Sequence, residues 1–495
     1  MKRILALCAM AAMALSAQTF TTLFSFDGKD GGDPQGALIQ ATDGNFYGTT
    51  SGGGTGVCTF SNGCGTVFRT TASGALTTLY NFCSLSLCAD GRAPEAGLVQ
   101  ATNGYLYGTT SGGGAGLCTL AGGCGTVFRI TLSGALTTLY NFCSQSGCAD
   151  GSGPAAGLVQ AADGYLYGTT YAGGADGGGT VFKITPSGAL TTLYSFCSQT
   201  ACTDGENPQA PLLQATDGIF YGTASQGGAN PGPFGTGGGT VFQITASGAL
   251  TTLYSFCAEV SSDGECTDGQ SPVAGLVQAT NGDLYGTTES GGPSNCGNGC
   301  GTVFRIAPSG TLTRLYSFGG GGDGANPEAR IIQATDGNFY GTTVYGGSRS
   351  KGTVFEITPS GTLTTLYNFC PQTAVEGCVD GKGPFGVVQG TNGEFYGTTE
   401  GGGVNNDGAV FSLSTGLGPF VETSPTSGPV GFVVKILGTD LTGATSVTFN
   451  GTAATFTVVS ASLIVTTVPS GATTGTVQVV TPTGTLSSNL PFRVL

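Results

Sequence analysis

The sequence predicts an all-β protein, a seven-bladed β-propeller followed by an immunoglobulin-like β-sandwich. Three observations predict this class. One unit recurs seven times, no stretch keeps a 3.6-residue apolar period, and near residue 418 the composition changes to alternating Thr and Val. Gly and Pro supply 91 and 21 of the 495 residues, so turns are frequent. The aliphatic and aromatic residues nevertheless recur at fixed intervals, which argues against a disordered chain.

Residues 1–17 are expected to be a signal peptide. Lys2 and Arg3 precede an apolar stretch (4–15), which ends in two small residues (16–17) suited to cleavage. This stretch is too short for a stable transmembrane span, and no later segment reaches the roughly 18 apolar residues that a helical span needs. We therefore expect an exported protein, extracellular or at the cell surface or in the periplasm, with no transmembrane anchor in its mature chain.

The propeller is expected to span residues 18–417. Each unit carries three signatures, which are close variants of LVQATDGNFYGTT, GTVFRITPSG and LTTLYSF. Asp-Gly or Asn-Gly between apolar runs is a strong hairpin signal, so each unit predicts four strands, and four-stranded sheets repeated around an axis form a propeller. The chain begins with an isolated fourth strand (18–26), and the last unit ends without one. We therefore predict that 18–26 closes the last blade and removes two exposed edges.

The cysteines predict local disulfide bonds. Without Cys8, which lies in the predicted signal peptide, 16 of the 17 cysteines remain, and they fall into eight close pairs. A unit that lacks one member of a pair lacks both, as a covalent pair requires. Zinc is the alternative, but the pairs lie far apart in the sequence and the chain has no histidine. Disulfides indicate an oxidising compartment. The predicted pairs are Cys58–Cys64, Cys83–Cys88, Cys118–Cys124, Cys143–Cys148, Cys197–Cys202, Cys257–Cys266, Cys296–Cys300 and Cys370–Cys378.

Residues 418–495 are expected to form the sandwich. Short Thr- and Val-rich strands such as FVVKILG, ATFTVVS and TVQVVTP alternate with turns every 8–12 residues, which is typical of immunoglobulin-like domains. This segment contains no cysteine, so the bridge of antibody domains is absent.

Two family resemblances cover essentially the whole mature chain. The unit LVQATDGNFYGTT…GTVFRITPSGALTTLYNF resembles the Gloeo-Verruco (GloVer) tandem repeat of exported bacterial proteins, sometimes called choice-of-anchor repeat proteins. The final segment, with SPTSGPVG, SVTFNGTAATF and VPSGATTGTVQVVTPTG, resembles the IPT/TIG immunoglobulin-like module. Neither resemblance implies a defined catalytic site. DGNFYGTT and ITPSG are also similar to virginiamycin B lyase, a propeller whose activity depends on a histidine that this chain lacks.

The composition excludes several functions. Without histidine there is no Ser-His-Asp triad, no Cys-His dyad and no His-ligated metal. The 15 Lys and Arg residues against 29 Asp and Glu give a net charge of −14, the wrong sign for nucleic-acid binding. We therefore expect a non-catalytic binding scaffold without a cofactor, its partner an extracellular glycan or a surface protein. The alternatives are a carbohydrate-active or lyase-type enzyme using carboxylates, with Glu328 and Glu95 as candidates, and a structural component of the envelope or matrix.

Residues shared by all seven units have two interpretations. The inter-blade loops contain Asp-Gly-x-x-Pro, whose carboxylates would suit calcium if they formed a ring, or would otherwise fix Asx-turns. Because all seven units share this aspartate, a structural role is favoured. A glutamine in each first strand and a tyrosine in each second strand are expected to be structural in the same way. The seven aspartates are Asp30, Asp90, Asp150, Asp204, Asp268, Asp323 and Asp380.

Departures from the repeat are more informative about a ligand site. In the sixth unit Arg330 replaces the glycine found at Gly97 and at the equivalent positions of two other units, and Glu328 lies two residues earlier. The same unit carries Arg349 and Lys351, in a chain of which only 9% is charged. These four residues are the candidate ligand-binding site. Solvated surface charge is the alternative interpretation.

Overall fold

The computed structural model describes residues 18–56, 63–115, 124–232, 235–293, 296–297, 299–371 and 377–495. The predicted signal peptide, Cys58 and Cys118 lie outside these ranges. The described residues contain no α-helix, and no helix among them is long and apolar enough to cross a membrane. Three short 3-10 helices occur, η1 (Ser86–Cys88), η2 (Ser146–Cys148) and η3 (Thr200–Cys202). The chain is all-β, as the sequence predicts.

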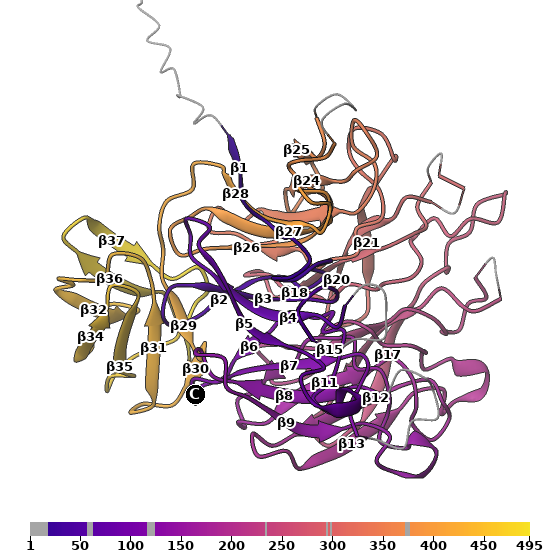
Figure 1. Ribbon diagram of the computed structural model, residues 1–495, viewed down its shortest axis with the longest axis horizontal. Coiled ribbons are helices and arrows are strands. Elements are labelled where there is room, and N and C mark those ends of the chain that lie inside the picture. Colours follow the sequence, from indigo (N-terminus) through magenta and orange to yellow (C-terminus); the bar gives the residue numbers. More distant parts are fainter. Residues whose placement is uncertain are drawn as a thin grey trace, which may run out of the picture.

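Residues 19–414 form seven four-stranded antiparallel sheets in a β-propeller-like arrangement, called the repeat sheets below (Figure 1). In the first six the strands pair in chain order, and the first strand has only two residues. The bounds are β2 (Ile39–Gln40), β3 (Phe46–Thr50), β4 (Thr66–Thr70) and β5 (Leu76–Asn81); β6 (Val99–Gln100), β7 (Leu106–Thr110), β8 (Thr126–Ile130) and β9 (Leu136–Asn141); β10 (Val159–Gln160), β11 (Leu166–Thr170), β12 (Thr180–Ile184) and β13 (Leu190–Ser195); β14 (Leu213–Gln214), β15 (Phe220–Ala224), β16 (Thr240–Ile244) and β17 (Leu250–Ser255); β18 (Val277–Gln278), β19 (Leu284–Thr288), β20 (Thr302–Ile306) and β21 (Leu312–Ser317); and β22 (Ile332–Gln333), β23 (Phe339–Thr343), β24 (Thr353–Ile357) and β25 (Leu363–Asn368).

The seventh repeat sheet joins the two ends of the repeat region. Its order is β1-β28-β27-β26, in which β1 (Thr19–Ser25) pairs antiparallel with β28 (Ala409–Ser414) beside β27 (Phe395–Gly401) and β26 (Lys382–Gln389). Phe20 on β1 stacks on Tyr367 with ring centroids 3.8 Å apart. The first strand of the chain therefore completes the last repeat sheet (Figure 1).

Buried aromatic side chains join each repeat sheet to the next. At four of the seven junctions the tyrosine of one second strand stacks on the phenylalanine that begins the second strand of the following sheet, as in Tyr167 on Phe220 at 4.1 Å, and at the other three that second strand begins with leucine. The same contact joins the last sheet to the first, where Tyr396 stacks on Phe46 at 4.1 Å. Each of these rings is at most 1% exposed, and burying such a side chain contributes roughly 1.5–3 kcal/mol. The repeated aromatic positions thus carry the packing between sheets.

The C-terminal residues form two further four-stranded sheets around one apolar core. The sheet orders are β29-β31-β35-β34 and β33-β32-β36-β37, and β30 pairs with β38 in parallel. Buried residues such as Val434, Val447 and Ile464 form the shared core. The short strands β29, β30, β33 and β37 were not among the predicted ones. The bounds are β29 (Glu422–Ser424), β30 (Ser427–Gly428), β31 (Val433–Leu437), β32 (Ser446–Phe449), β33 (Thr452–Ala453), β34 (Phe456–Ser460), β35 (Leu463–Thr467), β36 (Val477–Thr481), β37 (Gly484–Ser487) and β38 (Arg493–Val494).

The C-terminal sheets lie on one side of the repeat sheets, opposite most of the long loops (Figure 1). They contact the turns that follow the first strands of the repeats. Lys435 Nζ donates a hydrogen bond to the carbonyl of Thr102 (2.9 Å), and Ser462 Oγ donates one to the carbonyl of Thr42 (3.2 Å). The turns after the first strands of the first and second repeat sheets therefore contact the C-terminal sheets.

Candidate ligand-binding channel

The segments that lead into the first strands of the repeats, with parts of some of these strands, line a cavity of about 640 Å³, called the channel below. One end, the loop end, is formed by the residue that follows the proline of each Asp-Gly-x-x-Pro loop. The other end, the β29 end, includes Glu422 to Ser424 of β29 together with Leu437. The residues of the loop end are Gln35, Glu95, Ala155, Gln209, Val273, Glu328 and Phe385.

Glu328 lies among acidic side chains at the loop end. Burial, together with the negative charges of Glu289 and Glu400, raises the pKa of its carboxyl to about 7, and burial is the largest of these influences. Glu289 follows β19 in the fifth repeat sheet, and its own pKa is raised by burial. Gln35 Nε2 donates a hydrogen bond to Glu400 Oε1 (3.3 Å). A carboxyl that titrates near neutral pH can hold or release a proton under physiological conditions.

Glu95 occupies the loop-end position of the second repeat sheet. Its carboxylate accepts a hydrogen bond from Ser111 Oγ (2.9 Å), and the charge of Arg92 acts on it. Burial is the larger influence and raises its pKa. The groups that act on Glu328 do not include Glu95, so the two acids predicted as a possible catalytic pair belong to separate environments.

Arg330 lies deeper in the channel, two residues beyond Glu328. The residue has exposed surface and lines the cavity. Desolvation by the surrounding protein lowers the pKa of its guanidinium. The surface it exposes therefore faces the channel rather than bulk solvent. Among the described residues none forms a hydrogen bond or an ion pair with the guanidinium. Arginine remains charged in proteins, so the channel contains a cation that pairs with none of the described carboxylates.

Glu422 supplies a carboxyl at the β29 end. Burial raises its pKa to about 7, and Asn489 Nδ2 donates a weak hydrogen bond to its Oε1 (3.4 Å). Neither Arg330 nor Glu328 contributes to the environment of this carboxyl. The channel therefore has carboxyl groups at both ends and one arginine between them.

Arg349 and Lys351 lie outside the channel. Both are exposed in the loop between β23 and β24, and neither lines the cavity. The backbone carbonyl of Lys351 accepts a hydrogen bond from Gly383 N. Of the four candidate residues, the structure thus brings Glu328 and Arg330 together and leaves Arg349 and Lys351 apart.

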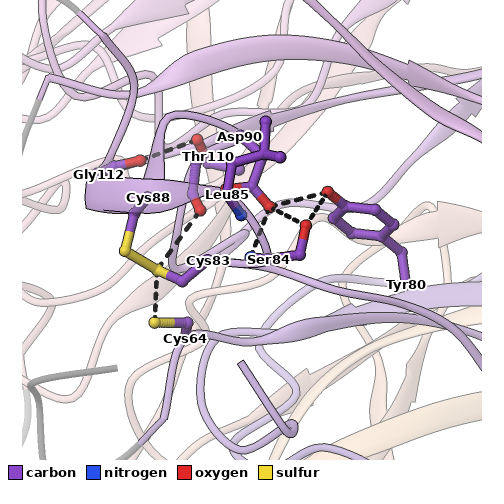
Figure 2. The surroundings of a disulfide bond; sticks show 10 residues. Cys64, Tyr80, Cys83, Ser84, Leu85, Cys88, Asp90, Thr110 and Gly112 are labelled. Carbon is purple, nitrogen blue, oxygen red and sulfur yellow. Dashed lines mark hydrogen bonds between the residues drawn. A yellow bond between two sulfur atoms is a disulfide. The ribbon is translucent and has the colours of Figure 1, made fainter. Parts of the chain in front are cut away.

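The repeated aspartates are engaged in local hydrogen bonds. Asp90 is fully buried, and its carboxylate accepts hydrogen bonds from Tyr80 Oη (2.8 Å), from Ser84 N and Oγ (2.9 Å each) and from Leu85 N (3.3 Å) (Figure 2). Five others accept from the tyrosine of the preceding fourth strand, whereas Asp30 accepts from Asp27 N. In the described ranges none of the seven belongs to a group of side chains close enough to hold a metal ion.

Disulfides close five of the loops that carry these aspartates, and a sixth, Cys296–Cys300, closes the loop between β19 and β20. The structure contains six of the predicted pairs, and Cys83–Cys88 lies beside the Asp90 carboxylate (Figure 2). Cys64 contacts Cys83, so the loop between β3 and β4 packs on the loop that follows β5. The pairs of Cys58 and Cys118 fall outside the described residues. The six are Cys83–Cys88, Cys143–Cys148, Cys197–Cys202, Cys257–Cys266, Cys296–Cys300 and Cys370–Cys378.

The repeated glutamines join adjacent sheets. Gln100 Oε1 accepts a hydrogen bond from Thr42 N (2.8 Å), and its Nε2 donates to the carbonyl of Gly104 (3.2 Å). The same bond runs from Thr391 N to Gln40 Oε1 (2.9 Å) between the last sheet and the first. These amides are therefore already paired with the protein backbone.

Sequence reasoning missed three acidic residues near the channel. Glu289 and Glu400 follow Gly-Thr-Thr, where the first two units have Ser51 and Ser111, so their departure from the repeat was a usable signal. Glu422 gave no such signal, because it belongs to the C-terminal sheets and reaches the channel only through the docking of those sheets.

The Gloeobacter/Verrucomicrobia repeat family model matches residues 10–121, 59–266 and 258–458, which together span most of the chain. This protein therefore belongs to the Gloeobacter/Verrucomicrobia repeat family. A search of curated proteins finds no similar sequence.

Two solved structures are among those found to be similar to this chain. A fungal alcohol oxidase of the AA5 family, in complex with copper, shares 13% identity over 96% of this chain and 98% of its own, with a TM-score of 0.50. A catalytically inactive variant of virginiamycin B lyase from Staphylococcus aureus, with quinupristin, shares 13% identity over 80% of this chain and 99% of its own, with a TM-score of 0.49. At such identities a likeness concerns the fold alone.

Proposed function

We propose that this protein is an exported, non-catalytic binding protein whose ligand enters the channel from the loop end. Residues 18–417 are a seven-bladed β-propeller whose last blade is completed by strand 18–26, and residues 418–495 are an immunoglobulin-like domain of the IPT/TIG kind. The predicted signal peptide and the six disulfides support export into an oxidising compartment.

One observation carries this proposal: two of the four charged residues that were singled out as departures from the repeat line the channel. Glu328 and Arg330 are unlike their counterparts in most units, and both line the cavity of about 640 Å³. Small-molecule sites in proteins commonly have volumes of about 300–1,000 Å³, whereas a protein partner buries about 800 Å² of a surface. The size favours a saccharide over a protein ligand.

The arrangement of carboxylates supports a role without catalysis. Glycosidases of the common type hold two acids about 5–10 Å apart around the scissile bond. Glu95 and Glu328, the two acids considered from sequence, come from the second and sixth repeat sheets and do not influence each other. Most of the remaining repeated acids are engaged in turn hydrogen bonds.

A carboxylate enzyme is the second candidate, because Glu289 lies close enough to Glu328 to raise its pKa. A carboxyl with a pKa of about 7 beside an ionised one is the combination that general acid catalysis uses. This pair was not recognised in the sequence. The binding assay below therefore includes a search for cleavage products.

The test is retention of immobilised glycans by the purified protein and two variants. Ala37 lies on the channel wall at the position equivalent to Arg330, and its surface is exposed to the cavity. Ala37→Trp therefore places an indole in the channel without removing an interaction. Ala72→Trp is the matched control, because Ala72 is exposed in the turn between β4 and β5.

We expect the parent and Ala72→Trp to retain the same glycans, and Ala37→Trp to lose at least 10-fold in affinity. Retention unchanged in Ala37→Trp would place the ligand outside the channel. Failure of the parent to retain any glycan would contradict the proposed function. Release of new reducing ends, abolished in Glu328→Gln, would replace it with the enzymatic alternative.

A further inference from the structure

The most unusual group in the channel is the guanidinium of Arg330. The equivalent positions of the other units are small or rigid, such as Ala37, Gly97 and Pro211. Backbone contacts confirm that these positions adjoin one another around the axis, since a Cβ on Gly97 would lie 2.6 Å from the carbonyl oxygen of Ala37. Among these equivalent positions, Arg330 therefore supplies the one long, charged side chain, at a level of the channel where the other units contribute small or rigid residues.

An unpaired charge in such a place needs a partner. Removing a cation from water is costly unless a counter-charge or several hydrogen bonds replace the lost hydration. Arg330 has neither among the described residues, and desolvation is the sole influence on its pKa. Arginine presents planar, paired donors that match carboxylate and sulfate oxygens in a bidentate geometry.

The carboxyl groups of the channel do not fill this role. Glu95 is held by Ser111, and Glu422 accepts from Asn489. The environment of Glu328 is set by Glu289 and Glu400 rather than by Arg330. Among the described residues, no carboxyl of the channel wall pairs with the arginine, so its donors are left available to a ligand.

We infer that the channel binds an acidic saccharide, with the guanidinium of Arg330 donating hydrogen bonds to its carboxylate or sulfate group. The inference rests on the proposed function and names the ligand class of the same site. The saccharide enters at the loop end, where Phe385 offers an aromatic surface and Gln209 an amide. The anionic group reaches inward to Arg330, and β29 forms part of the wall at the far end.

The loss of a charge-assisted bidentate interaction in a desolvated site is expected to cost a large part of the affinity. Arg330→Gly restores the residue of Gly97 and should weaken binding of an acidic saccharide by about 10- to 100-fold. Arg330→Lys keeps the charge but loses the planar fork, so an intermediate loss is expected. Arg349→Gly changes the net charge equally but alters an exposed loop, and it is the matched control.

The probes separate charge from saccharide identity. Oligogalacturonate supplies carboxylates, and its methyl ester supplies the same backbone without charge. A sulfated galacto-oligosaccharide and its desulfated form are the second pair. Inorganic sulfate is titrated alone. Binding is measured by calorimetry for the full-length protein and each variant, and the melting temperature of each variant is recorded so that misfolding is recognised.

We expect at least one acidic probe to bind the parent and Arg349→Gly alike, to lose 10-fold or more in Arg330→Gly, and to exceed its uncharged counterpart. Equal binding to Arg330→Gly and the parent would overturn the inference, as would equal losses for the charged and uncharged probes. Binding of uncharged probes alone would overturn it while sustaining the proposed function. If no saccharide binds but inorganic sulfate binds in an Arg330-dependent way, the anion site stands and the proposed function falls. A lowered melting temperature in Arg330→Gly would assign the arginine to the fold instead.

Discussion

Asp90 and Arg330 show how repeated and unrepeated residues differ in this molecule. Asp90 occurs in every unit, is fully buried, and accepts hydrogen bonds from a tyrosine, a serine and two backbone amides. Arg330 occurs once, faces the channel, and has no partner in the described part of the chain. Repetition therefore marks residues whose polar groups the fold already uses. At Arg330, departure from the repeat gives a residue whose polar group no described residue uses.

Deletion of residues 18–25 should have the largest effect on stability, because it removes β1, the strand that completes the seventh repeat sheet. β28 would lose its partner strand, and Tyr367 would lose its stacking on Phe20. We expect aggregation or a fall in melting temperature of about 10 °C or more, measured by calorimetry and light scattering. Thr21→Ser, an exposed change in the same strand, is the control. A monomeric deletion variant as stable as the parent would show that the seventh sheet does not depend on β1.

Asp90→Asn tests the repeated side of the comparison directly. The amide keeps the shape of the side chain but places a donor where the carboxylate accepts, in a fully buried position. We expect a loss of about 2–4 kcal/mol in the free energy of unfolding, measured with urea. Asp176→Asn changes an exposed aspartate and should be neutral. A neutral Asp90→Asn would mean that repetition of this residue has another cause.

Glu328→Gln tests a residue that departs from the repeat, and this substitution should increase the free energy of unfolding rather than lower it. The pKa of Glu328 rises from an ordinary 4.5 to about 7 on folding. The unfolded chain therefore releases this proton first, and the parent loses stability as the pH rises from about 4.5 to 7. We expect Glu328→Gln to be more stable than the parent by about 1–3 kcal/mol at pH 8 and equal to it at pH 4, by urea unfolding.

Glu259→Gln, an exposed change, should show no difference between the two pH values. A gain for Glu328→Gln of equal size at pH 4 and pH 8 would show that ionisation is not its cause. A loss at pH 8 would show that the ionised carboxylate supports the fold.

The repeated part of the fold was readable from the sequence because local signals and global architecture agree. Asp-Gly and Asn-Gly turns predict the hairpins, and the paired cysteines predict the loop closures that six disulfides confirm. The two-residue length of strands such as β2 was not predictable, because burial of the surrounding segment depends on the neighbouring sheets. The short strands β29 and β33 were missed for the same reason.

The site was only partly predictable. Glu328 and Arg330 were recognised as departures from the repeat. Arg349 and Lys351 were grouped with them because they are near in sequence, but they do not line the channel. The segment before β22 lines the channel, whereas the loop between β23 and β24 does not, so residues of one unit can belong to different surfaces. The contribution of Glu422 depends on docking of the C-terminal sheets, to which contacts such as Lys435 with Thr102 contribute. No local pattern encodes a contact across 333 positions.

The pairing of β1 with β28 sets an order of assembly. Thr19 faces Ser414, so the partner strand is the last one of the repeat region to be synthesised, 414 − 19 = 395 positions later. Until then β1 has no partner, and the seventh sheet is incomplete. Contacts of such long sequence range form slowly, because the chain between them must be ordered first. For nearly the whole of its synthesis, a growing chain therefore exposes the unpaired edge of β1. A strand from a second copy can pair with this edge before β28 is made.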